Sequence, residues 1–500
     1  MNPIKRLAGQ TAVYGLSNIV GRLLNYLLIP IYTRVFLPEE YGVVAELYAY
    51  VALFYVILTY GMGTAFFRFS NEAKDPAKVY GTALYSVLFS SLGFIILAGI
   101  LSPLIAGGLG YTAHIEYIIW FIIIIALDSF TTIPFARLRQ ENKAFRFAII
   151  KLSGIVLNIG LNLFFILYCP YVLNHHAGSA LASFIRSIYN PGMGVGYIFS
   201  INLFTSLFTL ILLAPELKGL KYGFDKLLWK KMMIYALPLL VMGLSGSINE
   251  SFDRILLKHL LPEKATAMAQ LGIYAACYKI SILMTLFVQT FGFAAEPFFF
   301  GESKKKDARE TYARVMDYFV IVCLFIFLGV MVYIEFVKRY VGVNFYSGLK
   351  IVPILLLANM FLGMFYNLSI WYKITNKTIY GAYISLAGAA ITLLANFIMI
   401  PFLGYLGSAW ATFICYLSIL ILSWWLGRKY YPVPYKVARI LFYSGVAIAL
   451  YFLNIYIKEI SGLHYFINGT LILFLFLLIV GSVEIYKNPM LKKTILAKLQ

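Results

Sequence analysis

The chain has 500 residues, of which 61% are hydrophobic and 12% are charged, and its formal net charge at pH 7 is +20. This composition, with a mean hydropathy of +0.83, lies far outside the range of soluble globular proteins and indicates a polytopic membrane protein. A soluble fold is therefore excluded. The positive charge requires no nucleic-acid partner, because Lys and Arg also mark the cytoplasmic loops of membrane proteins.

Apolar runs of about 18 residues or more are long enough to cross a bilayer and predict the helices in chain order. Six runs come first, at 10–36, 43–67, 80–104, 116–136, 146–168 and 194–214. Six more follow a polar break, at 233–260, 271–297, 315–337, 350–372, 380–402 and 407–427. A final pair occupies 437–457 and 465–485. The predicted fold class is an all-α polytopic membrane protein with about 14 transmembrane helices.

Basic residues are concentrated in every second loop between these runs. Arg68, Arg137 and Lys304 are examples, whereas the other loops retain only scattered basic residues such as Arg186 and Lys264. Because Lys and Arg near the ends of spans stay on the cytoplasmic side, both termini are predicted to be cytoplasmic.

The four cysteines are far apart, and each lies in or at the end of an apolar run. They are Cys169, Cys277, Cys323 and Cys415. This spacing predicts neither a disulfide framework nor a metal site. A phosphate-binding loop of the GxxxxGK[ST] type does not occur in the sequence, and no cofactor is expected.

A faint internal repeat relates the first six runs to the next six. Gly15-Leu16-Ser17 matches Gly243-Leu244-Ser245, and Asn162 matches Asn396; five such pairs are 226 to 234 residues apart. Many transporters consist of two related helix bundles with the substrate site between them. The repeat therefore predicts two pseudo-symmetric six-helix lobes.

The predicted lobes are residues 1–214 and 233–427, and helices 13 and 14 with a basic cytoplasmic tail occupy 428–500. The segment 215–232 joins the lobes and interleaves lysines with apolar residues. Such a pattern predicts an amphipathic helix on the inner membrane surface, where it would contact anionic lipids. A tether that also sets the topology is the simpler function for this linker.

Three sequence elements carry a resemblance to a known family. The first is Pro38-Glu39-Glu40-Tyr41-Gly42, and the second is Asp253-Arg254-Ile255-Leu256-Leu257 followed by Leu271-Gly272-Ile273-Tyr274. The third combines Asn396 with the stretch from Ile400 to Thr412. In order and spacing they resemble the bacterial polysaccharide-biosynthesis membrane proteins, which are lipid-linked oligosaccharide flippases of the O-antigen type.

The resemblance implies a transporter of the multidrug/oligosaccharidyl-lipid/polysaccharide exporter superfamily, not an enzyme. It would move undecaprenyl-diphosphate-linked oligosaccharide repeat units across the bacterial inner membrane by alternating access, for the assembly of O-antigen, capsule or exopolysaccharide. Its partners would be this lipid-linked glycan, membrane lipids, a polysaccharide polymerase and a chain-length regulator. The cavity between the lobes should contain cationic groups for the diphosphate and hydrogen-bonding groups for the sugar hydroxyls.

In the first lobe, Arg22 is the best candidate to bind the diphosphate, because it lies in the middle of a span. Asn25 and Tyr26 lie at helical spacings from it and are further candidates for substrate binding. A rise of about 1.5 Å per residue puts Arg22 and Asp128 at similar depth, so they form either part of the site or a structural ion pair. Asp128 is also a candidate for ion coupling or gating. Glu46, about one turn inside the outer boundary, is expected to reach water.

In the second lobe, the run from Asn249 to Arg254 places three ionisable side chains within an apolar span. Such groups are costly at bilayer depth and usually mark a functional site. Glu250 and Arg254 have the spacing of an ion pair along one helix, and Asp253 is at about the depth of Lys279 on the next helix, which predicts a bridge. We assign Asn249, Arg254 and Lys279 to substrate binding, and Glu250 and Asp253 to ion coupling or gating. A structural role for Asp253 and Arg254 is an equal alternative.

Two other functions remain open. An ion-coupled multidrug antiporter of the same superfamily would keep the fold, but its site for cations should be rich in carboxylates, whereas Arg22, Arg254 and Lys279 are basic. A membrane glycan polymerase should carry a large outer loop with catalytic acids or bases. The longest outer loop here, 169–193, contains no carboxylate, so the flippase is favoured.

Overall fold

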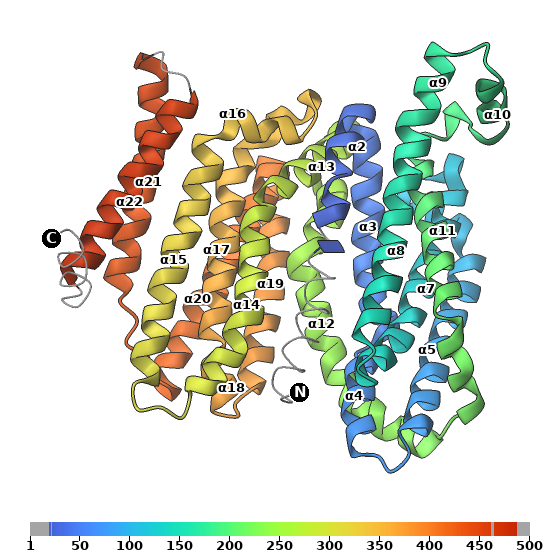
Figure 1. Cartoon of the computed structure of the whole chain (residues 1–500), viewed down its shortest axis with the longest axis horizontal. Coiled ribbons are helices and arrows are strands. Elements are labelled where there is room, and N and C mark those ends of the chain that lie inside the picture. Colours follow the sequence, from blue (N-terminus) through green and yellow to red (C-terminus); the bar gives the residue numbers. More distant parts are fainter. Residues whose placement is uncertain (1–19, 22, 462–464, 488–500) are drawn as a thin grey trace. The chain divides into compact units, whose positions relative to one another are not determined.

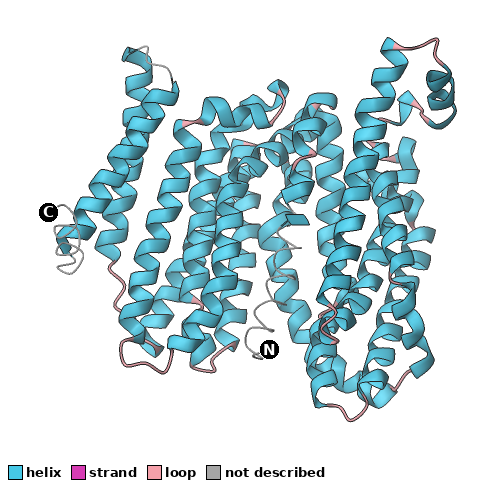
Figure 2. Ribbon diagram, in the orientation of Figure 1, coloured by secondary structure: helices cyan, strands magenta, loops and turns pink. Residues whose placement is uncertain are grey.

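The computed structural model describes residues 20–21, 23–461 and 465–487. Within these ranges every regular element is a helix, as Figure 2 shows. The chain forms two compact units whose boundary lies between Ala275 and Ala276, inside helix α13. They are called the N-terminal unit and the C-terminal unit below, and each has its own buried apolar core.

The helices of the N-terminal unit follow one another with short connections (Figure 1). They are α2 (Ile29–Val35), α3 (Pro38–Thr59), α4 (Met62–Glu72), α5 (Pro76–Ile100), α6 (Ser102–Leu109), η1 (Thr112–His114), α7 (Ile115–Gln140), α8 (Ala144–Asn162), η2 (Leu163–Tyr168), α9 (Cys169–His175), α10 (Ala180–Ile188), η3 (Pro191–Met193), α11 (Gly196–Leu212), η4 (Ala214–Tyr222), α12 (Lys226–Leu260) and α13 (Lys264–Tyr278), which extends past the boundary.

The C-terminal unit contains the remaining helices. They are η5 (Lys279–Ser281), α14 (Ile282–Glu302), α15 (Ala308–Val332), α16 (Ile334–Val337), η6 (Lys338–Tyr340), η7 (Val343–Ile351), α17 (Val352–Leu368), α18 (Ile370–Ile374), α19 (Ile379–Leu403), α20 (Tyr405–Tyr430), α21 (Val437–Ser461) and α22 (Tyr465–Lys487).

Among the described residues, twelve helices or continuous helix runs are long and apolar enough to cross a membrane. The bent pair formed by α10 with η3 and α11, which turns by 110°, makes a thirteenth if it is one span. The first predicted span, 10–36, lies largely outside the described residues, which include its end as α2. The predicted class, an all-α polytopic membrane protein, is confirmed, and the chain is a multi-pass membrane protein. The predicted lobe boundaries remain a prediction.

The first family motif begins α3. Pro38 occupies the first turn, where its missing N–H group costs no hydrogen bond. Two residues later, the Glu40 carboxylate accepts a hydrogen bond of 2.8 Å from the N–H group of Leu37. This satisfies one of the donors that a helix start leaves open.

The last residue of that motif, Gly42, allows a close helix contact inside the N-terminal unit. A Cβ atom at Gly42 would lie 2.2 Å from the carbonyl oxygen of Met268 on α13, and one at Gly272 would lie 1.9 Å from the carbonyl oxygen of Pro38. Both distances are far below van der Waals contact. The glycines of the first and second motifs therefore serve one purpose, which is to let the backbones of α3 and α13 touch.

The third motif forms the turn between α19 and α20. Gly404 has a positive φ of 57°, a conformation that glycine adopts without steric cost. A Cβ atom at Gly407 would lie 2.5 Å from the carbonyl oxygen of Met399. Asn396 is fully buried and donates from Nδ2 to the carbonyl oxygen of Thr392, at 2.8 Å. The two glycines therefore allow the tight turn and the close packing of α19 and α20 in the C-terminal unit.

The predicted linker 215–232 is divided between η4 and the first turns of α12, rather than forming one surface helix. Asp225 caps α12 by accepting hydrogen bonds from the N–H groups of Leu227 and Leu228, and it pairs with Lys78 of α5 at 2.9 Å. The Leu228 hydrogen bond and the Lys78 ammonium hold the pKa of the Asp225 carboxyl below its usual value. The start of α12 is thus attached to α5.

Helices α21 and α22 pack against α15 in the C-terminal unit (Figure 1). Near the start of α21, Arg439 pairs with the buried Asp317 of α15 at 2.8 Å. Near the other end of α21, Lys458 pairs with Glu335 of α16, also at 2.8 Å. Ion pairs near both ends therefore fix the last helix pair on the remainder of this unit.

Candidate functional site

Asp253 is the most constrained member of the charged run on α12. Its side chain is buried, and the residue is 3% exposed. Oδ2 accepts a hydrogen bond of 2.5 Å from the hydroxyl of Tyr274 on α13, and Oδ1 accepts one of 2.8 Å from the N–H group of Arg254. The Arg254 Nη1 atom lies 3.5 Å from the same Oδ1. Both carboxylate oxygens therefore have donors, as a buried charge requires.

Arg254 does not form the predicted pair with the Glu250 carboxylate. Its Nη1 atom donates instead to the main-chain carbonyl oxygen of Glu250, at 2.7 Å, and only 11% of its side chain is exposed. Glu250 itself is exposed and forms no ion pair within the described part of the chain. The four-residue spacing brings Arg254 back over the preceding turn, where the carbonyl oxygen and the adjacent Asp253 both attract it.

Asn249 is half-buried on the same helix. Lys279 begins η5 and belongs to the C-terminal unit. The predicted bridge from Asp253 to Lys279 would join the two units and stays a prediction. Within the N-terminal unit, the hydroxyl of Tyr274 and the main chain and guanidinium of Arg254 surround Asp253.

The candidates on the first predicted span are only partly described. Arg22 lies outside the described residues, so its predicted proximity to Asp128 stays a prediction. Asn25 is exposed and Tyr26 is half-buried, in the turn of helix that precedes α2.

Asp128 lies on α7, and its Oδ1 atom accepts a hydrogen bond of 2.8 Å from the Ser206 hydroxyl of α11. One turn away, the Asn202 side chain donates to the hydroxyl of Tyr48 on α3, at 2.8 Å. Lys151 of α8 acts electrostatically on Asp128. The carboxylate is therefore the centre of a polar cluster that joins four helices of the N-terminal unit.

A second polar chain in this unit was not predicted as part of a site. The Tyr32 hydroxyl of α2 donates to Asn162 at 2.8 Å, and Asn162 donates to the carbonyl oxygen of Asn158, also at 2.8 Å. The Asn158 side chain donates to Thr205 of α11 at 3.4 Å. The signal was present in the sequence, because the two asparagines are four residues apart and share one face of α8.

Glu46 does not reach water, contrary to the prediction, because it is 0% exposed. Lys258 near the end of α12 donates to both of its carboxylate oxygens, at 3.0 and 2.8 Å, and the Tyr111 hydroxyl donates to Oε2 at 2.5 Å. Lys258 also donates to the carbonyl oxygen of Leu109, at 2.5 Å. The carboxylate is saturated with donors, which explains how a charge is tolerated there.

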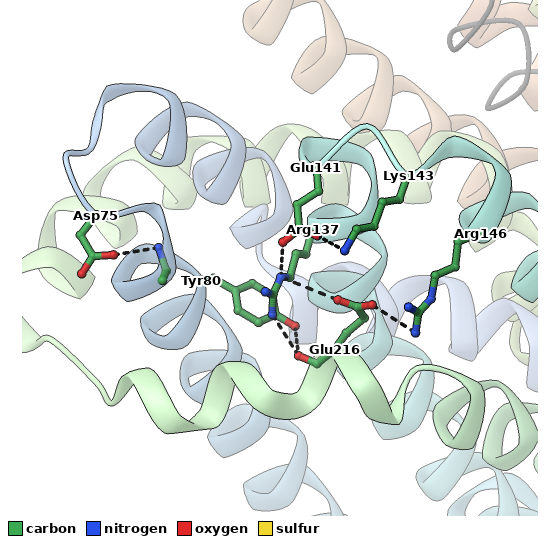
Figure 3. A network of polar contacts seen from close by, with 8 residues as sticks. Asp75, Tyr80, Arg137, Glu141, Lys143, Arg146 and Glu216 are labelled. Atoms are coloured by element: carbon green, nitrogen blue, oxygen red, sulfur yellow. Dashed lines mark hydrogen bonds and ion pairs between the residues drawn. The ribbon is translucent and has the colours of Figure 1, made fainter.

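Another charged network holds the linker at the opposite end of the N-terminal unit (Figure 3). Glu216 of η4 is buried and lies 3.7 Å from Arg137 and 3.3 Å from Arg146. Its carbonyl oxygen accepts a hydrogen bond of 2.9 Å from Tyr80, and Arg137 lies over the Tyr80 ring. Arg137 also pairs with Glu141 at 2.6 Å. The linker is therefore bound to α5, α7 and α8 through one glutamate.

The structure shows no group of three or more potential metal ligands of the types His, Cys, Asp and Glu among the residues it describes. The four cysteines are free thiols in buried positions. Their environments agree with packing roles.

A family model described as "Polysaccharide biosynthesis protein" matches residues 7–301 of the chain. No match was found among curated proteins.

Solved structures resemble the fold over most of the chain. Lipid II flippase MurJ in an inward closed conformation has a TM-score of 0.65 and 14% identity, covering 94% of this chain and 98% of its own. A multidrug resistance MATE family transporter of the MOP superfamily, facing inward, has a TM-score of 0.61 and 16% identity, covering 82% and 94%. A MOP superfamily transporter from Pyrococcus furiosus has a TM-score of 0.51 and 15% identity, covering 84% and 95%. At these identities the likeness shows the fold.

Proposed function

Because the chain belongs to the polysaccharide biosynthesis protein family, we propose that it is a flippase for undecaprenyl-diphosphate-linked oligosaccharide repeat units. It moves them across the bacterial inner membrane by alternating access, for the assembly of O-antigen, capsule or exopolysaccharide. A polysaccharide polymerase and a chain-length regulator act with it, and the chain itself catalyses no covalent reaction. The MOP-type fold supports transport, since similar folds belong to a lipid II flippase and to a multidrug resistance transporter.

The observation that carries the proposal is the guanidinium of Arg254 on a membrane-spanning helix. Leu260 ends α12, so at about 1.5 Å per residue Glu250 lies roughly 15 Å from that end, near the middle of a hydrocarbon core of about 30 Å. Arg254 reaches back to the Glu250 carbonyl oxygen, which places its charge at similar depth. A guanidinium matches the geometry of phosphate oxygens, and a charge at this depth usually marks a substrate or ion path.

The polar interior of the N-terminal unit supports a glycan substrate. Tyr48, Asn158 and Asn202 present hydroxyl and amide groups on spanning helices. Such groups form the hydrogen bonds that sugar hydroxyls require, without adding charge. The polyprenyl tail can stay in the lipid while the diphosphate and the sugars pass through the protein.

A test is complementation of a deletion strain with variants at position 254. Arg254→Ala should fail to relieve the accumulation of cytoplasm-facing lipid-linked repeat units, and Arg254→Lys should restore transport only partly, because an ammonium lacks the planar pair of donors. Glu263→Gln, on the exposed turn before α13, is the matched control and should complement fully. Full complementation by Arg254→Ala would contradict the assignment.

An ion-coupled multidrug antiporter is the second candidate, and Asp128 is the observation that favours it. This carboxylate lies on a spanning helix with one hydroxyl donor, from Ser206, and could carry a cation through the membrane. For an antiporter, deletion should alter drug tolerance without any accumulation of lipid-linked repeat units. For a flippase that is coupled to an ion, Asp128→Asn should slow glycan transport and leave drug tolerance unchanged.

A further inference from the structure

Tyr274 brings the second family motif together across two helices. It lies on α13, is 0% exposed, and directs its hydroxyl at Asp253 of α12 with a hydrogen bond of 2.5 Å. Gly272, two residues before Tyr274, lets the backbone of α13 lie against the carbonyl oxygen of Pro38. This contact sets how closely α13 approaches α3 and, with it, the position from which the Tyr274 side chain reaches Asp253.

Asp253 passes this constraint to Arg254. With Oδ2 held by Tyr274, the carboxylate can turn little, and Oδ1 faces the N–H group and the Nη1 atom of Arg254. Nη1 has a second partner in the Glu250 carbonyl oxygen. An arginine side chain has many rotamers, and their loss on binding an anion reduces affinity. Because Nη1 of Arg254 already faces two fixed acceptors, much of the side chain's rotamer freedom is lost before the substrate binds.

The carboxylate also balances the charge of the guanidinium in a site with little exposure. Only 4% of the Asp253 side chain and 11% of the Arg254 side chain are exposed. Without its hydroxyl donor, one buried oxygen of Asp253 would need a new partner, and the guanidinium of Arg254 already lies 3.5 Å from the other oxygen. The arginine would then turn toward Asp253 and away from an incoming phosphate.

We propose that Tyr274 is a positioning residue which, through Asp253, holds the Arg254 guanidinium where it meets the diphosphate of the lipid-linked glycan. This inference rests on the proposed function and extends it to a residue that makes no contact with substrate. The Asp-Arg and Gly-x-Tyr elements of the sequence then form a single unit, in which the glycine sets the helix spacing, the tyrosine orients the acid, and the acid orients the base.

The test is a double-mutant cycle on the full-length protein in lipid nanodiscs, with an undecaprenyl-diphosphate-linked sugar as the probe for binding. Tyr274→Phe removes one hydroxyl and keeps the ring, and it should weaken binding about tenfold, the usual scale for a hydrogen bond to a charged group. In an Arg254→Ala background, the same change should alter binding less than about twofold, because a positioning residue acts only through its target.

Tyr312→Phe in the C-terminal unit is the matched control, since Tyr312 is equally buried and donates 2.7 Å to the carbonyl oxygen of Phe299. It should lower thermal stability about as much as Tyr274→Phe and leave binding unchanged. Equal weakening by Tyr274→Phe with and without Arg254 would show a purely structural role and overturn the inference. Wild-type binding by Tyr274→Phe would overturn it too. A wild-type protein that does not bind the probe at all would overturn the proposed function and, with it, this assignment.

Discussion

Removal of Lys258 should destabilise the N-terminal unit more than the loss of any exposed charge. Lys258→Met takes away both hydrogen bonds to Glu46, which is 0% exposed, and leaves that carboxylate with the Tyr111 hydroxyl as its remaining donor in the described structure. Breaking a buried ion pair from one side costs about 3–5 kcal/mol. A change of about 1 kcal/mol shifts Tm by roughly 2–4 °C in a domain of 150–250 residues, so we expect a fall of roughly 6–20 °C.

The assay is thermal unfolding of the purified protein in one detergent, for Lys258→Met, Glu46→Gln and the double variant. The double variant should recover much of the loss, because an amide at position 46 needs no cation and can keep its hydrogen bond to Tyr111. Lys264→Met is the control; this lysine is exposed and binds only the carbonyl oxygen of His259 in the described structure, and its loss should cost less than about 0.5 kcal/mol. Additive losses in the double variant would refute the coupling of Glu46 and Lys258.

Three further predictions concern the helix contacts and the charges. Gly272→Ala should abolish stable folding or transport, because no rearrangement of side chains relieves a clash with the backbone. Gly160→Ala has no atom within 4 Å of its added Cβ and should be tolerated. The expression level and the unfolding temperature of each variant test this difference. Asp225→Asn should lower the unfolding temperature at neutral pH and make that temperature depend less on pH in acid. The reason is that the pKa of the Asp225 carboxyl is lowered in the folded protein. Such a carboxyl stabilises the fold above its unfolded pKa of about 3.9, and this stabilisation is lost as the pH falls through its pKa in the folded protein. If Asp253 orients Arg254, exchange of the charges at Asp253 and Lys279 should leave transport as inactive as either single reversal; transport restored in the swapped variant would support the predicted bridge and contradict the orienting role.

The sequence predicted the helices well because membrane spans are set by length and apolarity alone. It placed the charges of α12 at membrane depth for the same reason. The depth of a residue along a helix does not show toward which neighbouring helix its side chain points. For this reason the burial of Glu46 was not predicted. Glu46 lies in the first half of α3 and Lys258 in the last turn of α12, 212 residues apart, and only the packing of α3 against α12 shows that they face each other.

The partners of Asp253 illustrate the same limit at shorter range. Tyr274 is 21 residues away, within the family motif itself, and its position on the next helix could have suggested the contact. The spacing of Glu250 and Arg254 predicted a pair of side chains, but a main-chain carbonyl oxygen one turn back satisfies a guanidinium equally well. Local rules of helix spacing do not distinguish these two acceptors.

Helix α12 is held at both ends by the N-terminal unit. Asp225 and Lys78 attach its beginning to α5, and Lys258 and Glu46 attach its last turns to α3. A helix that is attached at both ends can change direction only by bending between the two attachments or by breaking one of them. Pro238 lies inside α12 and removes a main-chain hydrogen bond, so bending there costs less than exposing the unpaired carboxylate of Glu46.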